Sequence, residues 1–259
     1  MSSSALNIKP EEIDTVEKRG KYAVSIIGCG QIGVFHACLF ADAGFKVKCV
    51  DADQTVVNSI LRGKAPFLRC EIELKLKNYV KTGLLSATAD VRTAVSQSDI
   101  IAITIPLQID EKKKVDYSNM ENACRKVGSG LRRGALVIVM VTTGLGVTED
   151  LIKEILENTS GFRVGGDFGL VYSPIRVSNA YTPETIANQE RIVAATDKNS
   201  LSAASTILET IAKSVVKKAG NIKTAEVATL FEAVEQDVNS ALANELALLC
   251  ERVGVDYLE

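Results

Sequence analysis

Three closely spaced glycines are the residues whose types and spacing best fit a chemical role. They lie in the segment Gly28-Cys-Gly-Gln-Ile-Gly33, between the apolar run Ala23–Ile27 and a helical pattern. In such a unit the first glycine permits a tight turn, the second lets a pyrophosphate approach the backbone, and the third packs the helix on the sheet. Free N–H groups at the helix start then meet the phosphates. The alternative is a glycine turn that binds nothing. We predict a dinucleotide-binding turn with contacts from Gly28, Gly30, Gln31, Ile32 and Gly33.

An acidic residue directly follows the next apolar run, and its position indicates which dinucleotide would bind. Asp51 follows the predicted strand Lys46–Val50. A carboxylate at this place accepts hydrogen bonds from both adenine-ribose hydroxyls and repels a 2′-phosphate. The sequence therefore favours NAD over NADP. The nearby Asp53 is predicted to cap the following helix.

Cysteine and histidine offer little for metal or nucleophilic chemistry. The six cysteines are far apart, with no C-x-x-C pair, and His36 is the single histidine. This pattern argues against a zinc site and, in a reducing compartment, against a disulfide scaffold. We expect most of the cysteines to be small buried apolar residues. We expect His36 to be a packed or partly exposed helix residue and not a catalytic base.

Apolar runs that alternate with helical periodicity supply the elements around these residues. The predicted strands are Ala23–Ile27, Lys46–Val50, Ile100–Ile105, Ala135–Thr142, Gly169–Tyr172 and Arg191–Ala195. The predicted helices are Ile32–Ala43, Gln54–Arg62, Glu71–Lys81, Asn119–Val127 and Glu149–Leu156. Continuous apolar strands separated by helices indicate a mostly parallel sheet covered on both faces. We predict an α/β fold with a doubly wound Rossmann-type domain over residues 21–200.

The two ends of the chain differ from this alternating part. Residues 1–20 are polar, and we predict an arm with a short helix from Pro10. Residues 201–259 are predicted to be helical and to end in one long helix from about Thr224 to Val253, which contains no Pro or Gly. Apolar residues recur along it at steps of three and four, so one face needs burial. We predict that this region forms a homodimer interface or the spine of a second domain.

Composition excludes several classes of function. Of 259 residues, 46% are hydrophobic and 24% charged, with a net charge of −2. No global positive field favours nucleic acid or an anionic membrane. No apolar run reaches the roughly 18 residues needed to span a bilayer. The first residues are polar and include acids, unlike a signal peptide. We expect a cytoplasmic protein without nucleic-acid or membrane partners.

Further motifs follow the glycine turn in order. They are VDAD (50–53), DIIAITIP (99–106), VTTGLGVTE (141–149), VYSPIRV (171–177), RIVAA (191–195), DVNSALANELA (237–247) and LCERVGVD (249–256). Together with IIGCGQIG they resemble the UDP-glucose/GDP-mannose dehydrogenase family, the nucleotide-sugar 6-dehydrogenases, over residues 21–259. That family includes UDP-N-acetylmannosamine dehydrogenase.

The resemblance implies a fold and a reaction. Such enzymes have a Rossmann-like NAD domain, a long central dimerising helix and a second Rossmann-like domain for the nucleotide sugar. They oxidise the sugar C6 alcohol to a carboxylate with two NAD, and a cysteine thiolate captures the intermediate aldehyde. A lysine, an asparagine and a glutamate assist. The resemblance also adds Pro106 and Thr142 to the predicted NAD-facing residues.

The residues implied for catalysis are not carried over. The glutamate position holds Ile175, the lysine position Thr229 and the asparagine position Ala233. The cysteine-bearing segment would come after Glu259. We therefore assign no catalytic residue and no metal ligand, and we expect the chain to be inactive by itself.

Three hypotheses remain at this point. The chain is the N-terminal part of a longer nucleotide-sugar dehydrogenase, which would bind a nucleotide sugar only with a C-terminal domain. Alternatively it is a catalytically degenerate NAD-binding paralogue that acts as a sensor or partner subunit. The third is a different dehydrogenase of the broader 6-phosphogluconate-dehydrogenase-like superfamily, with Lys223 in place of the lost lysine.

Overall fold

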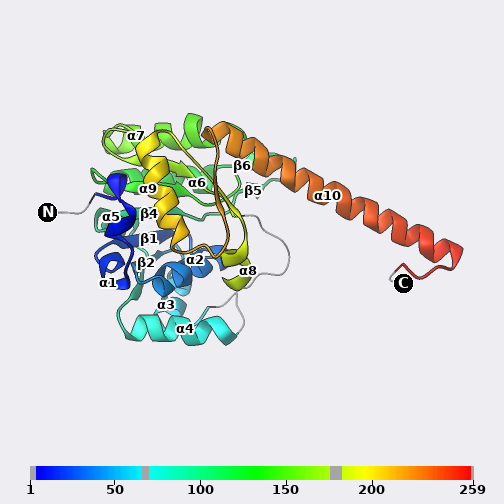
Figure 1. Cartoon of the computed structure of the whole chain (residues 1–259), viewed down its shortest axis with the longest axis horizontal. Coiled ribbons are helices and arrows are strands. Elements are labelled where there is room, and N and C mark those ends of the chain that lie inside the picture. The colour runs from blue at the N-terminus through cyan, green and yellow to red at the C-terminus, as the bar shows by residue number, and fades with distance from the viewer. Residues whose placement is uncertain (1–3, 66–69, 176–182, 258–259) are drawn as a thin grey trace.

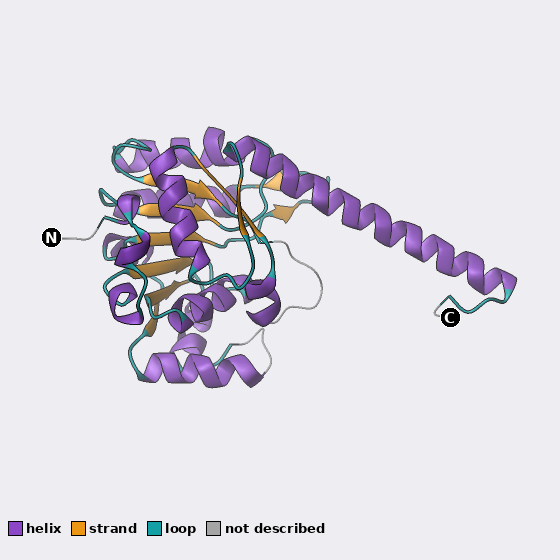
Figure 2. Cartoon of the chain, in the orientation of Figure 1, coloured by secondary structure: helices purple, strands orange, loops and turns teal. Residues whose placement is uncertain are grey.

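A single large sheet organises the chain. The computed structural model describes residues 4–65, 70–175 and 183–257. Helices cover the strands on both sides, and one long helix projects away from them (Figures 1 and 2). In sheet order the strands are β10 (Val216–Lys218), β9 (Arg191–Ala195), β8 (Gly169–Tyr172), β7 (Leu136–Val139), β4 (Ile100–Ile103), β1 (Ala23–Ile27), β2 (Lys46–Val50) and β3 (Leu85–Thr88).

The strand order confirms the predicted α/β fold class. Neighbouring strands are parallel, for example Val24↔Val47 between β1 and β2, except that β8 and β9 pair antiparallel. The chain fills the sheet outward from β1 on one side and then from β4 on the other, so the winding reverses between these two strands. A doubly wound sheet places its ligand crevice at such a point, outside the carboxyl ends of the strands.

Helices connect the strands. They are α2 (Gln31–Asp42), α3 (Gln54–Leu61), α4 (Cys70–Lys81), α5 (Val91–Ser96), α6 (Ser118–Gly130), the π-helical turn η3 (Val147–Ile152), α7 (Lys153–Ser160), α8 (Pro183–Asn188), α9 (Lys198–Glu209) and α10 (Ile222–Val253). Along β7, Leu136 and Ile138 join one apolar cluster, while Val137 and Val139 join another. Since successive strand residues point to opposite faces, the sheet has a core on each face. This explains why its strands read as continuous apolar runs.

The N-terminal segment differs from the predicted polar arm. It forms η1 (Ala5–Asn7), η2 (Pro10–Glu12) and α1 (Val16–Arg19), and η2 is the short helix expected from Pro10. The side chains of Leu6, Ile8 and Ile13 are buried in the core. The amide of Leu6 donates to the carbonyl oxygen of Gly134 at 3.2 Å. From residue 4 onward this segment therefore packs as part of the sheet domain.

The sheet continues past residue 200, where we predicted the domain to end. Strand β10 pairs with β9, with Val216 opposite Arg191. Helix α9 packs against these strands. The predicted helical region 201–259 thus contains a strand, and only α10 leaves the sheet (Figure 1). A three-residue edge strand with two lysines carries too weak an apolar pattern to be recognised from sequence.

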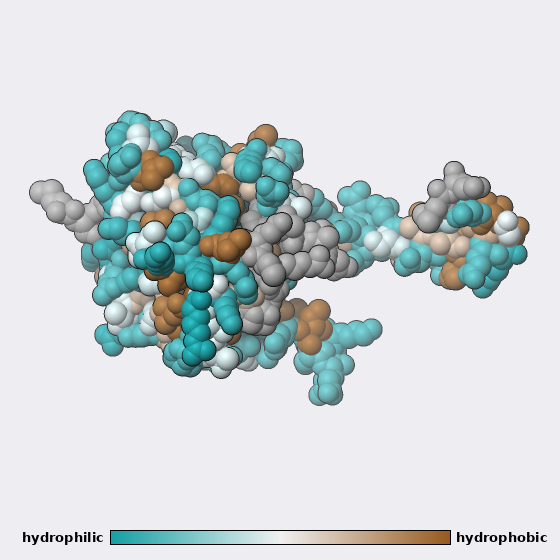
Figure 3. All heavy atoms as spheres, turned by 90° about the horizontal axis from the view of Figure 1, so that it is seen from below, coloured by the Kyte–Doolittle hydropathy of each residue, from teal (hydrophilic) through white to brown (hydrophobic). Residues whose placement is uncertain are grey.

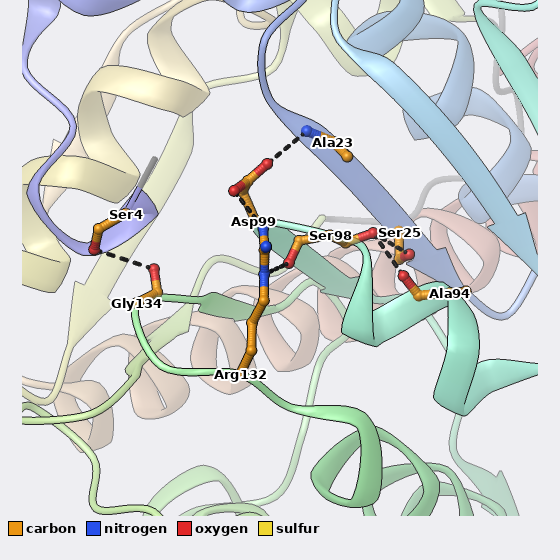
Figure 4. A network of polar contacts seen from close by, with 8 residues as sticks. All are labelled: Ser4, Ala23, Ser25, Ala94, Ser98, Asp99, Arg132 and Gly134. Carbon is orange, nitrogen blue, oxygen red and sulfur yellow. Dashed lines mark hydrogen bonds and ion pairs between the residues drawn. The ribbon is translucent and has the colours of Figure 1, made fainter. Parts of the chain in front are cut away.

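A partly buried ion pair stabilises the amino ends of the strands. The side chain of Asp99, just before β4, accepts hydrogen bonds from the amide of Ala23 (2.8 Å) and from the Arg132 guanidinium (2.5 Å). Ser98 contacts the Ser25 hydroxyl at 2.7 Å (Figure 4). Burial raises the pKa of Asp99, opposed by the bond from Ala23 and the charge of Arg132. These contacts hold β1, β4 and the turn before β7 together.

No helix within the described ranges combines the length and the apolar character needed to cross a membrane.

His36 is fully buried on α2, as a packed helix residue. Its Nδ1 lies 2.9 Å from the carbonyl oxygen of Ile32, and its Nε2 lies 3.4 Å from Nη1 of the buried Arg191. The carbonyl can only accept, so Nδ1 carries the proton and Nε2 accepts from Arg191. Burial, with the charge of Arg191, lowers the pKa of His36 to about 3.

This pKa makes the fold sensitive to mild acid. Between pH 6.5 and about 3 the unfolded chain protonates His36 and the folded chain does not, so the free energy of unfolding falls as pH falls through this window. We expect His36 to remove about 2 kcal/mol of stability between pH 7 and pH 5. Urea unfolding at both pH values measures this loss. In His36→Gln the drop in unfolding free energy from pH 7 to pH 5 should be smaller by about 2 kcal/mol than in the unaltered chain. Equal pH dependence in the two proteins would contradict a buried neutral imidazole.

Candidate cofactor-binding site

The turn after β1 requires glycine at two positions. Gly28 has φ +95°, a conformation that side chains disfavour. A Cβ on Gly33 would lie 2.0 Å from the carbonyl oxygen of Gly28. The Thr104 hydroxyl donates to that same oxygen at 2.6 Å. The first turn of α2 thus packs directly on the loop that leaves β1, as the motif predicted.

Gly30 meets a different constraint. It is the N-cap residue of α2, without a side-chain cap, and it is exposed. A Cβ added to it would have no atom of the described residues within 4 Å. Gln31 and Ile32 begin the helix, whose first amides have no partner within it. Space and free donors therefore meet where a phosphate would bind.

Asp51 is tied to the glycine turn. Its Oδ2 accepts from the amide of Cys29 at 2.7 Å, and its Oδ1 accepts from the amide of Asp53 at 3.0 Å. Each carboxylate oxygen retains accepting capacity for a ribose hydroxyl. Asp53 caps α3 through the amide of Thr55 at 2.7 Å, which confirms its predicted role. Sequence reasoning missed the bond from Cys29 to Asp51.

Pro106 and Thr142 lie on the loops after β4 and β7. Pro106 is exposed and Thr142 half-buried. The order β7-β4-β1-β2 places the carboxyl ends of these strands along one edge, with the glycine turn between Asp51 on one side and Pro106 and Thr142 on the other. The sheet thus brings the predicted residues to the carboxyl ends of its central strands, and their contacts with a cofactor stay predictions.

Glu226 belongs to this edge and was not found from the sequence. It lies on α10 and is fully buried. Its carboxylate accepts hydrogen bonds from the Thr143 hydroxyl (3.1 Å) and from the amides of Gly146 (2.6 Å) and Thr148 (3.0 Å). The available signal was a charged residue among the apolar residues that begin α10.

The positions linked by resemblance to catalysis carry no acid, base or cation. Ile175 is buried in the core at 3% exposure. The buried Thr229 donates its hydroxyl proton to the carbonyl oxygen of Ala225 at 2.9 Å, and Ala233 is exposed on α10. Lys223 lies 3.5 Å from Asp150, both of them largely exposed, and so forms a surface ion pair. The motif at 171–177 ends in two residues outside the described ranges.

Five of the six cysteines have a described side chain, and Cys70 is the exception. Cys29, Cys38, Cys49 and Cys124 are buried, as expected, and Cys250 is half-buried on α10. Burial raises the pKa of Cys38 and of Cys124 to about 12, which keeps both as thiols. Within the described residues, no group of three or more His, Cys, Asp or Glu side chains could hold a metal ion.

A hollow of about 880 Å³ lies at the opposite edge of the sheet. Lys46, Asp99 and Arg132 line it near the amino ends of the strands. The glycine turn, Asp51 and Thr142 do not line it. Because doubly wound sheets bind ligands at their carboxyl edge, the hollow is separate from the candidate site.

Comparison with known proteins relates this chain to dehydrogenases. The description "UDP-glucose/GDP-mannose dehydrogenase family, NAD binding domain" matches residues 22–216. UDP-N-acetyl-D-mannosamine dehydrogenase of Pyrococcus horikoshii is 33% identical over 237 residues, which cover 91% of this chain and 56% of that protein. UDP-N-acetyl-D-glucosamine 6-dehydrogenase of Pseudomonas aeruginosa is 27% identical, with 90% and 54% covered.

Solved structures of dehydrogenases have a similar fold. A ternary complex of GDP-mannose dehydrogenase from Pseudomonas aeruginosa matches with a TM-score of 0.85 at 25% identity, over 90% of this chain and 54% of that one. The structure of the Pyrococcus horikoshii UDP-D-ManNAc dehydrogenase has a TM-score of 0.84 at 31% identity, over 91% and 56%. The chain spans about half the length of the curated relatives it matches.

Substitutions at Gly30 and Gly33 should affect stability and NAD affinity differently. A Cβ at Gly30 enters open space, so we expect Gly30→Ala to keep its free energy of unfolding within about 1 kcal/mol and to lose NAD affinity at least about tenfold. Gly33→Ala, which meets backbone at 2.0 Å, should lose about 2 kcal/mol or more of stability as well. Gly220→Ala, remote and with open space, is the control. Urea unfolding and titration calorimetry measure both quantities. Unchanged NAD affinity of Gly30→Ala would contradict the prediction that the pyrophosphate approaches the backbone at Gly30.

Proposed function

The chain belongs to the UDP-glucose/GDP-mannose dehydrogenase family and carries the family's NAD-binding domain, and from this premise we propose that it is the cofactor-binding part of a nucleotide-sugar 6-dehydrogenase. One observation carries the proposal. At the sheet's reversal point, a glycine turn with open space at Gly30 lies beside a carboxylate, Asp51, which is hydrogen-bonded to that turn.

The residues of this edge fit NAD. The amides at the start of α2, next to Gly30, would hold the pyrophosphate, and Asp51 would accept from the adenine ribose. Pro106 and Thr142 would then flank the nicotinamide half, since they follow the strands on the other side of the turn. When bound, NAD supplies the acceptor for a hydride from an alcohol. The chain's own part is to bind and orient it.

The substrate is proposed from the relatives. The Pyrococcus horikoshii relative, at 33% identity, and the 6-dehydrogenase of Pseudomonas aeruginosa, at 27%, are named for UDP-N-acetylhexosamines. The GDP-mannose dehydrogenase is 25% identical, so we favour a UDP-N-acetylhexosamine whose C6 alcohol is oxidised. Neither Ile175 nor Thr229 can act as an acid or a cation there. The proposal therefore gives these two positions no part in proton transfer or charge stabilisation. The alternative of a degenerate paralogue has no support among these relatives, all named as dehydrogenases.

We further propose that two copies associate through α10. Beyond its first turns the helix exposes a stripe of large apolar side chains, among them Phe231 (71%), Val238 (60%) and Leu242 (56%). Figure 3 shows brown atoms toward the free end of this projecting helix. An exposed apolar stripe of this length marks an interaction site. A second copy fits because a two-fold axis packs the same stripe against itself, as in most homodimers.

The cofactor proposal is tested by binding. We expect the chain to bind NAD more tightly than NADP, and Asp51→Ala to weaken NAD at least about tenfold because the ribose loses its acceptor. Asp53→Ala is the matched control: it removes the cap of α3 at a cost of about 1 kcal/mol in stability but leaves Asp51 and NAD affinity in place. Calorimetry measures the affinities. Absence of binding by the unaltered chain at millimolar NAD would refute the proposal.

The dimer proposal is tested by mass. We expect light scattering to give about twice the chain mass of 27.8 kDa. Leu242→Glu should weaken the dimer at least about tenfold, because it buries a charge in the stripe. Asn244→Glu adds the same charge two residues along the helix, on roughly the opposite face, and should leave the dimer intact. A monomeric unaltered chain, or equal dissociation by both variants, would overturn the proposal.

A further inference from the structure

A buried carboxylate joins the long helix to the loop after β7. Glu226 lies in the second turn of α10 and has no exposed surface. It accepts one hydrogen bond from a hydroxyl, that of Thr143, and two from backbone amides, those of Gly146 and Thr148. These three donors lie within six consecutive residues, so the loop wraps around the carboxylate and is held by it.

The charge of Glu226 is offset by this loop. Among the described residues no lysine, arginine or histidine pairs with it. A buried charge is costly unless it is hydrogen-bonded, and charge-assisted hydrogen bonds are the strong ones. Thr148 belongs to the first turn of η3, where the helix dipole also favours an anion. Burial of the Glu226 carboxylate therefore depends on the loop conformation, and the loop conformation depends on Glu226.

The loop is the one that carries Thr142. Its neighbour Thr143 is held from two sides, because its hydroxyl donates to Glu226 and its amide donates to the Tyr172 hydroxyl at 3.4 Å. Beyond it, Gly146 has φ +82° and its amide donates to Glu226 at 2.6 Å. Thr142 thus lies between strand β7 and Thr143, whose hydroxyl and amide are both hydrogen-bonded. It is at the carboxyl end of the strands, on the side of the glycine turn away from Asp51.

We propose that Glu226 is a positioning residue for the cofactor: it holds the loop 142–146 in the shape that places Thr142 against the nicotinamide half of NAD. The inference rests on the proposed function. It assigns to α10 a role at the cofactor edge that is separate from the exposed stripe further along the helix. Glu226 acts through Thr142 and does not itself contact the ligand, since it is fully buried.

The two halves of the cofactor provide the test. ADP contains the adenine ribose and the pyrophosphate but not the nicotinamide half, so its binding depends on the glycine turn and Asp51 only. Glu226→Gln keeps the size of the side chain, but its NH₂ group must face a loop donor. In the full chain we expect this variant to bind NAD about tenfold more weakly and ADP within about twofold of the unaltered chain. A purely structural role would weaken both ligands or neither.

A second variant and a control make the result decisive. Thr143→Val removes one donor and leaves the carboxylate, so we expect a loss in NAD affinity of about threefold and none in ADP affinity. This variant decides the question if Glu226→Gln does not fold. Asp99→Asn changes another buried acid, at the opposite edge of the sheet, and should lower stability without changing either affinity.

The outcomes are distinct. Failure of the unaltered chain to bind either ligand overturns the proposed function and this inference with it. If the unaltered chain binds NAD and the Glu226 and Thr143 variants bind it equally well, or lose NAD and ADP in parallel, the positioning role is wrong while the proposed function stands. Selective loss of NAD by the two variants, absent in Asp99→Asn, supports the inference.

Discussion

The contact between Gly33 and the carbonyl oxygen of Gly28 determines how α2 leaves the sheet. Because no side chain fits between them, the helix begins directly over the end of β1, the strand that pairs with β2 on one side and β4 on the other. The Thr104 hydroxyl, which follows β4, donates to the same oxygen. This single carbonyl therefore links β1, β4 and α2. A looser approach would move the helix amides away from the point where the winding of the sheet reverses, which is where doubly wound sheets bind their ligands.

Carboxylates fix the loops on both sides of this point in the same manner. Asp51 accepts from the amide of Cys29 in the glycine turn and from that of Asp53 after β2, and Glu226 accepts from two amides on the β7 side. In each case an anion gathers amides that an irregular loop would otherwise leave without partners, which is the condition for burying loop backbone. They differ in exposure. Asp51 is partly exposed and can also face a ligand, whereas Glu226 is fully buried and can act only through the loop.

Sequence patterns predicted the elements whose signal is local. Strands β1, β2, β8 and β9 have the predicted bounds, since each is a continuous apolar run between turn residues. The short strand β3 and the two-residue strands β5 (Gln108–Ile109) and β6 (Val115–Asp116) were missed, because they are too short or too polar to show a period. The site divides in the same way. The glycine turn and Asp51 follow from motif spacing, whereas Glu226 contacts residues about eighty positions away, and no local pattern encodes that contact.

The exposed stripe of α10 and the cofactor edge are energetically separable. The buried residues of the helix, Ile222, Ala225, Glu226 and Thr229, all lie in its first turns and complete the packing of the sheet domain. The large apolar residues beyond them are exposed and contribute no packing to that domain. Residues without shared partners contribute independently to stability and binding. We therefore expect the sheet domain to fold, and to hold the loops after β1, β2 and β7 in place, whether or not the stripe is covered.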